Sequence, residues 1–116
     1  MDANELKAQT KRFALRIIKF VGGFPKTKVG DIIGGQLLRA GTSVAANYRS
    51  AKARSRRDFV SKTTIVEEEA DESQFWLEMV MESGLNSSES ALDLHREARE
   101  LTAIFTASGK TAKLNR

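Results

Sequence analysis

The residues best placed to do chemistry in this sequence are carboxylates, seven of which lie within 16 positions. Carboxylates on facing helices can hold two metal ions when two of those helices also supply a Glu-x-x-His motif. The chain has a single histidine, His95, and no such motif, so we interpret the acidic run as a solvated helix face and expect no metal and no cofactor. The seven residues are Glu67, Glu68, Glu69, Asp71, Glu72, Glu78 and Glu82.

Glu69 and Glu72 differ from the rest of the acidic run because they lie beside the apolar stripe that includes Val66 and Ser73. A carboxylate at the edge of a core is costly to bury without a cation beside it. We therefore expect both side chains to be partly buried and to have a cationic partner.

A basic cluster surrounds the turn that we expect between the second and third helices, and only Asp58 interrupts it. Its members are Arg49, Lys52, Arg54, Arg56, Arg57 and Lys62. A phosphate backbone is a natural ligand of such a cluster, through ion pairing and counterion release. The alternatives are a solvated loop or a set of partners for the acidic run of a neighbouring chain. Because Arg56 and Arg57 begin a helix, where the helix dipole disfavours cations, their presence favours a role beyond stability.

Apparatus for catalysis is missing from the sequence. Ser43 has no histidine that the sequence brings near it, so a nucleophile and base pair is unsupported. The glycines do not stand between a strand and a helix as a phosphate loop requires, and there are no cysteines for a thiolate site. We predict that the protein is not an enzyme.

The composition is that of one globular domain covering residues 1–116, but its charge is unevenly divided. Residues 1–62 contain 14 Lys/Arg and 4 Asp/Glu, which gives +10, whereas residues 63–116 contain 5 and 11, which gives −6. This division suggests a complementary assembly or one basic working face. The apolar runs are too short to span a membrane and the N-terminus lacks a signal peptide, so the expected location is the cytoplasm.

Apolar residues recur with helical period in four stretches, which predict an all-α, antiparallel up-down four-helix bundle. The helices are expected at about 4–21, 27–52, 55–83 and 86–108, with a polar tail at 110–116. Ser55 and Asn86 each stand three residues before an acidic residue, as in a capping box. The main stripe residues are Leu6, Phe13, Ile17, Val29, Ile33, Leu37, Val44, Phe59, Thr63, Val66, Ala70, Ser73, Leu77, Val80, Ala91, Leu94, Ala98, Leu101 and Phe105.

Four glycines, Gly30, Gly34, Gly35 and Gly41, lie within the second predicted helix, where each costs roughly 1 kcal/mol relative to alanine. Gly34 and Gly41 are one heptad apart, which favours the close approach of another helix, either inside the bundle or from another subunit. The alternative is a frayed or kinked first half of this helix.

Three large apolar residues in a row, Phe75-Trp76-Leu77, are wider than one core stripe needs. One of them is therefore expected to face a second surface, such as a subunit interface. Asn47 and Tyr48 follow the stripe of the second helix, and we interpret Asn47 as a residue that satisfies hydrogen bonds rather than one that does chemistry.

The segment 41–49, Gly-Thr-Ser-Val-Ala-Ala-Asn-Tyr-Arg, resembles the signature of the bacterial four-helix bundle family named for the 23S rRNA intervening sequence. The likeness continues through Ser55, Asp58-Phe59 and Lys62 to Glu69, Glu72 and Trp76-Leu77-Glu78. The motif residues that it marks as structural are Ser43, Asn47, Tyr48, Glu69, Glu72 and Trp76. Ser50 and Glu68 depart from the pattern, since related sequences commonly carry Glu and Lys there.

The resemblance implies a four-helix subunit that assembles into a ring, commonly a pentamer, and no established enzymatic activity. The retroelement accessory variability proteins share this fold and ring, and they are basic and bind nucleic acid. Our first hypothesis is a non-enzymatic homo-oligomer that contacts RNA or DNA through the basic cluster. The second is a structural or protein-interaction scaffold in which basic and acidic halves pair between subunits.

Overall fold

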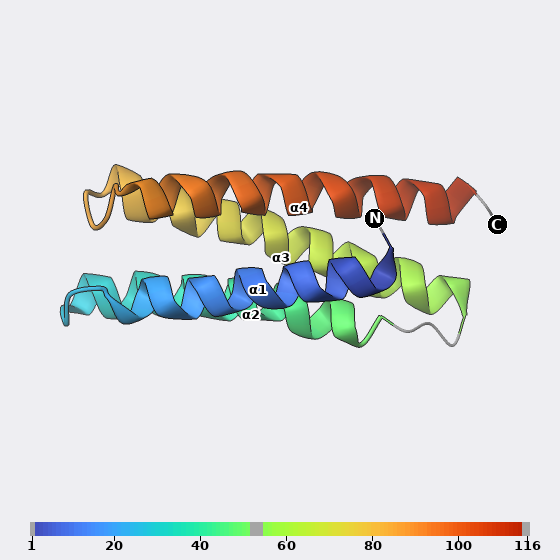
Figure 1. Ribbon diagram of the computed structural model, residues 1–116, viewed down its shortest axis with the longest axis horizontal. Coiled ribbons are helices and arrows are strands. Elements are labelled where there is room, and N and C mark those ends of the chain that lie inside the picture. Colours follow the sequence, from blue (N-terminus) through green and yellow to red (C-terminus); the bar gives the residue numbers. More distant parts are fainter. Residues whose placement is uncertain (1, 52–54, 115–116) are drawn as a thin grey trace.

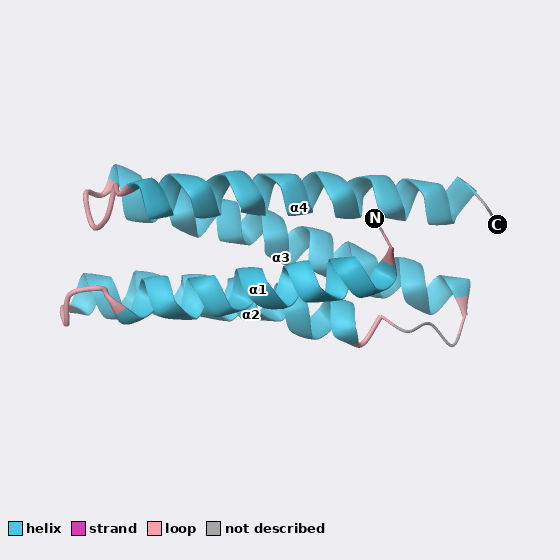
Figure 2. Cartoon of the chain, in the orientation of Figure 1, coloured by secondary structure: helices cyan, strands magenta, loops and turns pink. Residues whose placement is uncertain are grey.

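The four predicted helices are present, and they form an all-α, antiparallel up-down bundle (Figure 1). The structure is a computed structural model that describes residues 2–51 and 55–114, with side chains up to residue 111. Within these residues the elements are α1 (Ala3–Gly22), α2 (Lys28–Arg49), α3 (Arg56–Glu82) and α4 (Glu89–Leu114), and no strand occurs. Figure 2 shows that the described loops lie at the two ends of a rod measuring 48 × 20 × 19 Å.

Neighbouring helices in the chain are also neighbours in space. Helix α2 packs on α1, α3 packs on α2 and α4 packs on α3, whereas α1 and α4 touch only sparsely. We call α1 and α2 the basic pair and α3 and α4 the acidic pair, because the Lys, Arg, Asp and Glu residues of the first two helices sum to +6 (8 − 2) and those of the last two to −5 (7 − 12). The division of charge along the chain thus becomes a division between two sides of the bundle.

The core follows the predicted stripes, with one error. Val29 is 55% exposed, although the sequence pattern assigned it to the stripe of the second helix. Ile33 and Phe59 are half-buried at the edge of the core. The largest fully buried side chains are Phe13, Ile17, Leu37, Val44, Val66, Leu77, Val80, Leu94, Leu101 and Phe105.

Side-chain oxygens cap the helix N-termini. The Ser55 hydroxyl accepts from the backbone N–H of Asp58 at 3.2 Å, which confirms the predicted cap. The prediction for the fourth helix was wrong by two residues, because Ser88 rather than Asn86 precedes it. Ser88 accepts from the backbone N–H of Ala91, and Asn86 accepts from the backbone N–H of Ser88 in a turn outside the helix.

Two helix ends also differ from the prediction. Helix α2 ends at Arg49 with Ser50 as its C-cap, short of the expected Lys52. Helix α4 continues through the expected stop at Ser108-Gly109 as far as Leu114. A methyl group at Gly109 would meet no other atom, so this glycine faces open space and costs α4 only its intrinsic helix penalty.

Two of the four glycines of α2, Gly34 and Gly41, are explained by close packing against α1. A Cβ atom at Gly41 would lie 2.9 and 3.0 Å from Cγ1 and Cγ2 of Ile17, and one at Gly34 would lie 3.0 Å from Cγ1 of Val21. The prediction that another helix approaches closely is therefore confirmed, and the approach is made inside the bundle. Helix α2 runs without interruption through these positions, so a frayed first half is excluded.

Gly41→Ala is expected to lower the free energy of unfolding by about 1–2 kcal/mol. Overpacking a core costs about 1–3 kcal/mol, and the gain in helix propensity offsets at most about 1 kcal/mol. Gly35→Ala is the matched control, since a methyl group there meets nothing within 4 Å and the variant should be as stable as the parent or more stable. Urea denaturation of both variants measures the difference, and equal effects at the two positions would contradict it.

Candidate nucleic-acid interface

The end of the bundle where α2 finishes and α3 begins collects most of the predicted phosphate-binding residues (Figure 1). Arg49 lies in the last turn of α2, and Arg56 and Arg57 lie in the first turn of α3, and all three are exposed. Lys62 lies in the second turn of α3 and is half-buried. Lys52 and Arg54 fall outside the described residues. We call this end of the bundle the basic end.

Sequence reasoning missed the contribution of α1 to the basic end. Helix α1 runs antiparallel to α2, so the first turns of α1 lie beside the last turns of α2. Lys7 and Lys11 therefore lie near Arg49. Lys110, on the last turns of α4, is exposed at the same end. The up-down topology itself was the signal that could have found these residues, since it brings the start of the first helix to the end of the second.

The acidic residues at the basic end serve helix N-termini. Asp2 accepts a hydrogen bond from the backbone N–H of Glu5 at 2.8 Å, and this bond holds the pKa of the Asp2 carboxyl below its usual range. Glu5 and Asp58 lie in the first turns of α1 and α3, where the helix dipole favours negative charge. The carboxylates of Asp2, Glu5 and Asp58 therefore stabilise the N-termini of α1 and α3.

An ion-pair cluster joins the basic pair to the acidic pair at the α2–α3 seam. Arg39 of α2 lies 3.0 Å from the Glu69 carboxylate and also contacts Glu72. Both glutamates are partly buried, so the predicted burial and the predicted cationic partner are confirmed.

A second ion pair crosses the seam between α1 and α4, where Arg16 lies 2.7 Å from the Glu97 carboxylate. Burial raises the pKa of Glu97 above its ordinary value, although Arg16 acts in the opposite direction. Because the raised pKa means that folding disfavours the ionised carboxyl, any stability from this group is lost as the pH rises through that pKa. The pair orients α1 on α4, and the cost of burying the Glu97 carboxylate offsets part of the attraction to Arg16.

Most of the motif residues line the α2–α3 seam. The Asn47 amide donates to the backbone carbonyl of Ser43 at 2.9 Å, in keeping with its interpretation as a hydrogen-bonding residue. Trp76 stands two helix turns beyond Glu69 along α3, and its half-buried ring packs against the core. Its buried Nε1 has no hydrogen-bond partner within the described part of the chain.

Tyr48 is the motif residue that belongs to the core. Its ring packs against Phe105 of α4 with the ring centres 5.2 Å apart. Burial, and then the charge of Asp2, raise the pKa of the Tyr48 hydroxyl. Tyr48 therefore stays neutral at physiological pH and acts as a packing residue near the basic end.

The described residues assemble no catalytic or metal-binding group. Ser43 and His95 lie on α2 and α4, which are not neighbouring helices of the bundle, and His95 instead pairs with Glu78 at 2.9 Å. No cluster of three potential metal ligands occurs in residues 2–51 and 55–111. Over the same part of the chain, no helix combines the length and apolar character that a bilayer span requires.

Comparison with known proteins gives two matches in agreement. Residues 3–107 match the family model of the 23S rRNA-intervening sequence protein. The crystal structure of a protein of unknown function from the S23 ribosomal protein family of Bacteroides thetaiotaomicron is similar, with a TM-score of 0.86 at 30% identity, covering 95% of this chain and 99% of that one. No curated protein matches the chain. Neither of the two descriptions names an enzymatic activity.

Replacing Arg39 by Gln should reduce the free energy of unfolding by about 1 kcal/mol, because the partly buried Glu69 and Glu72 lose their cation. Arg96→Gln is the control, since its i,i+3 pair with Asp93 is more than half exposed on both sides and should contribute less than about 0.5 kcal/mol. Chemical denaturation at low and high salt measures both. Equal losses in the two variants would show that the seam pair has no special role.

Proposed function

The chain belongs to the 23S rRNA-intervening sequence protein family, and we propose that it is a non-enzymatic, homo-oligomeric protein that binds RNA or DNA at its basic end. The observation that carries the proposal is the gathering of cations from separate helices at one end of the bundle. Arg49, Arg56 and Arg57 come from α2 and α3, and Lys7 and Lys11 come from α1. A polyanion gains from such a surface through the release of its counterions.

The cations of the basic end are not consumed by the two inter-helix ion pairs. Those pairs use Arg16 and Arg39, which lie nearer the middle of the bundle. The carboxylates at the basic end sit at helix starts, where the helix dipole already favours them. This end of the bundle therefore has more cations than carboxylates, and such a surface attracts a polyanion.

Self-association is supported by an exposed apolar patch along the α2–α3 seam. Val29, Ile32 and Phe75 are 55%, 55% and 47% exposed, and the Phe75 ring contacts Trp76. The pairing of Arg39 with Glu69 sets the register, and two helix turns further on it brings Ile32 level with Trp76. We call these four residues the seam patch, and we propose that a second copy of the chain covers it.

Charge favours a copy of this chain as the partner. The α2 side of the seam patch belongs to the basic pair and the α3 side belongs to the acidic pair. A head-to-tail contact would set the α2 edge of one copy against the α3 edge of the next, so that opposite charges attract. Repeated contacts of this kind close into a ring when the rotation allows it, and a pentamer is the ring that the family resemblance suggests.

The alternative is a scaffold with no nucleic-acid role, in which the seam patch and the two charged sides of the bundle serve only assembly. The seam patch is the observation that favours it, because exposed apolar surface marks a protein interface rather than a phosphate site. The two functions separate when the basic end is changed and the mass of the oligomer is measured alongside nucleic-acid binding.

The double variant Arg56→Ser/Arg57→Ser should bind RNA several-fold more weakly than the parent while keeping the same oligomer mass. The slope of log affinity against log salt should become shallower by about 0.7–0.9 for each lost phosphate contact. Filter binding with a 23S rRNA fragment, an unrelated RNA and a DNA duplex, over a series of salt concentrations, measures both quantities.

The matched control is Lys26→Ser/Lys28→Ser, which removes two exposed cations from the opposite end of the bundle. Its binding should remain close to that of the parent. The nucleic-acid proposal would be overturned if the parent protein bound no nucleic acid at low salt, or if its affinity did not change with salt concentration. An oligomer that dissociates in the Arg56/Arg57 variant would instead support the scaffold.

Phe75→Ser should shift the protein from oligomer to monomer, because it replaces a half-exposed aromatic ring at the centre of the proposed contact. Leu92→Ser is the control, since Leu92 is 53% exposed on α4, away from the seam patch. Light scattering after size exclusion gives the masses of both variants, and circular dichroism checks that both remain helical. Unchanged mass in Phe75→Ser would rule out the seam patch as the subunit contact.

A further inference from the structure

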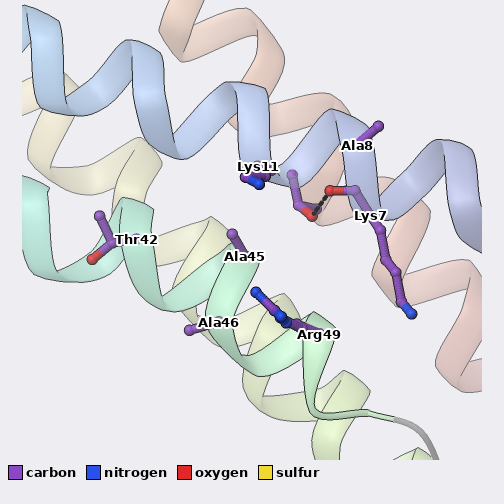
Figure 3. Close-up of a pocket in the computed structure, with 8 residues that line it drawn as sticks. Lys7, Ala8, Lys11, Thr42, Ala45, Ala46 and Arg49 are labelled. Atoms are coloured by element: carbon purple, nitrogen blue, oxygen red, sulfur yellow. Dashed lines mark hydrogen bonds between the residues drawn. The ribbon is translucent and has the colours of Figure 1, made fainter.

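A groove runs between α1 and α2 at the basic end, and we infer that it holds the sugar–phosphate backbone of a nucleic-acid strand without reading the bases. This inference rests on the proposed function and adds to it a place and a mode of recognition. The groove has a volume of about 600 Å³ (Figure 3). It is lined by Lys7, Ala8, Thr10, Lys11, Thr42, Ala45, Ala46 and Arg49.

The surface of the groove is made by small side chains. Ala8 comes from α1, and Ala45 and Ala46 come from α2, so the long side chains in the lining are those of the cations alone (Figure 3). The hydroxyl of Thr42 donates to the Leu38 carbonyl at 2.7 Å, and the hydroxyl of Thr10 donates to the Leu6 carbonyl at 3.0 Å. Because both hydroxyl protons are used within their own helices, we assign the contacts to a ligand to Lys11 and Arg49.

Cations stand on both walls of the groove. Lys11 is exposed on α1 and Arg49 is exposed on α2, and Figure 3 shows Arg49 extending from α2 into the space between the helices. Lys7 stands one helix turn before Lys11, about 6 Å along the axis. None of the residues that line the groove is acidic, so a bound anion would meet positive charge from two sides without a repelling carboxylate in the lining.

The lining also determines what the groove cannot recognise. It contains no aromatic side chain on which a base could stack, and no Asn or Gln that could pair with a base edge. Contacts from Lys and Arg to phosphate carry affinity but no sequence information. Binding in the groove is therefore expected to use contacts to phosphate rather than base stacking or adenine recognition, and to depend strongly on salt.

The groove is continuous with the remainder of the basic end, because Arg49 belongs to both. A strand lying in the groove passes the last turn of α2 and reaches the first turn of α3, where Arg56 and Arg57 are exposed. The recognition surface thus includes the groove between α1 and α2, the last turn of α2 and the first turn of α3.

The test uses the full chain and fluorescently labelled oligo(dT) and oligo(dA) of about 20 nucleotides. Lys11→Gln removes one cation from the groove, and Ala46→Leu fills the groove at an exposed position without changing charge. Lys19→Gln is the matched control, because Lys19 is an exposed cation in the last turn of the same helix. Fluorescence anisotropy over a salt series gives affinities and slopes, and light scattering gives the oligomer mass of each variant.

The parent should bind the two oligonucleotides with affinities within about threefold, as expected for backbone contacts alone. Lys11→Gln should bind several-fold more weakly, and its slope of log affinity against log salt should be shallower by about 0.7. Ala46→Leu should also bind more weakly, but its slope should change less. Lys19→Gln should match the parent in both quantities. Parent binding that neither groove variant changes would overturn the groove while leaving the proposed function intact. Parent protein that binds neither oligonucleotide would contradict the proposed function itself. A strong preference of the parent for one homopolymer would also overturn the inference. So would loss of the oligomer in Lys11→Gln, because it would show that another subunit covers the groove.

Discussion

The close contact between α2 and α1 at Gly41 and Gly34 is the constraint on which much of this structure depends. With no Cβ atom at Gly41, Ile17 can pack directly on the α2 backbone, and Val21 and Phe24 do the same at Gly34. This contact fixes how far α1 is shifted along α2 and how the two helices are rotated. The same shift brings Lys11 to the level of Ala46 and Arg49, so the groove at the basic end is a consequence of packing nearer the middle of the bundle.

Electrostatics then joins the two sides of the bundle. The basic and acidic pairs share one apolar core, and ion pairs join them at two helix junctions. Arg39 pairs with Glu69 and Glu72 between α2 and α3, and Arg16 pairs with Glu97 between α1 and α4. The opposite charges of the two parts of the sequence are therefore used partly inside the chain. Cations from three helices gather at the basic end, and the exposed side chains of Val29, Ile32 and Phe75 lie along the α2–α3 seam. The proposed ligand would bind the basic end, and the proposed subunit contact would be made by the seam patch.

The fold was largely predictable because its signals are local. The stripe from Val66 to Val80 and the cap at Ser55 are each set within a few residues, and both are as predicted. The errors arose where local signals compete. Asn86 and Ser88 are both good capping residues, and only the course of the turn after Gly84, which has a φ of 79°, decides that Ser88 starts the helix. Gly109 has the form of a stop signal, yet α4 continues because its buried face still packs on the core as far as Phe105 and the glycine faces solvent.

By itself, the sequence determined four amphipathic helices, the cap at Ser55, the division of charge and the need of Glu69 and Glu72 for a cation. The tertiary structure alone decided that Arg39 supplies that cation, that Phe75 rather than Leu77 faces outward, and that Lys11 stands across a groove from Arg49. The physical reason is the same in each case. A helix fixes the angular order of its own side chains, but the partner each side chain meets depends on the rotation and shift of a second helix. In this bundle those are set by contacts such as that of Gly41 with Ile17, between residues distant in the sequence.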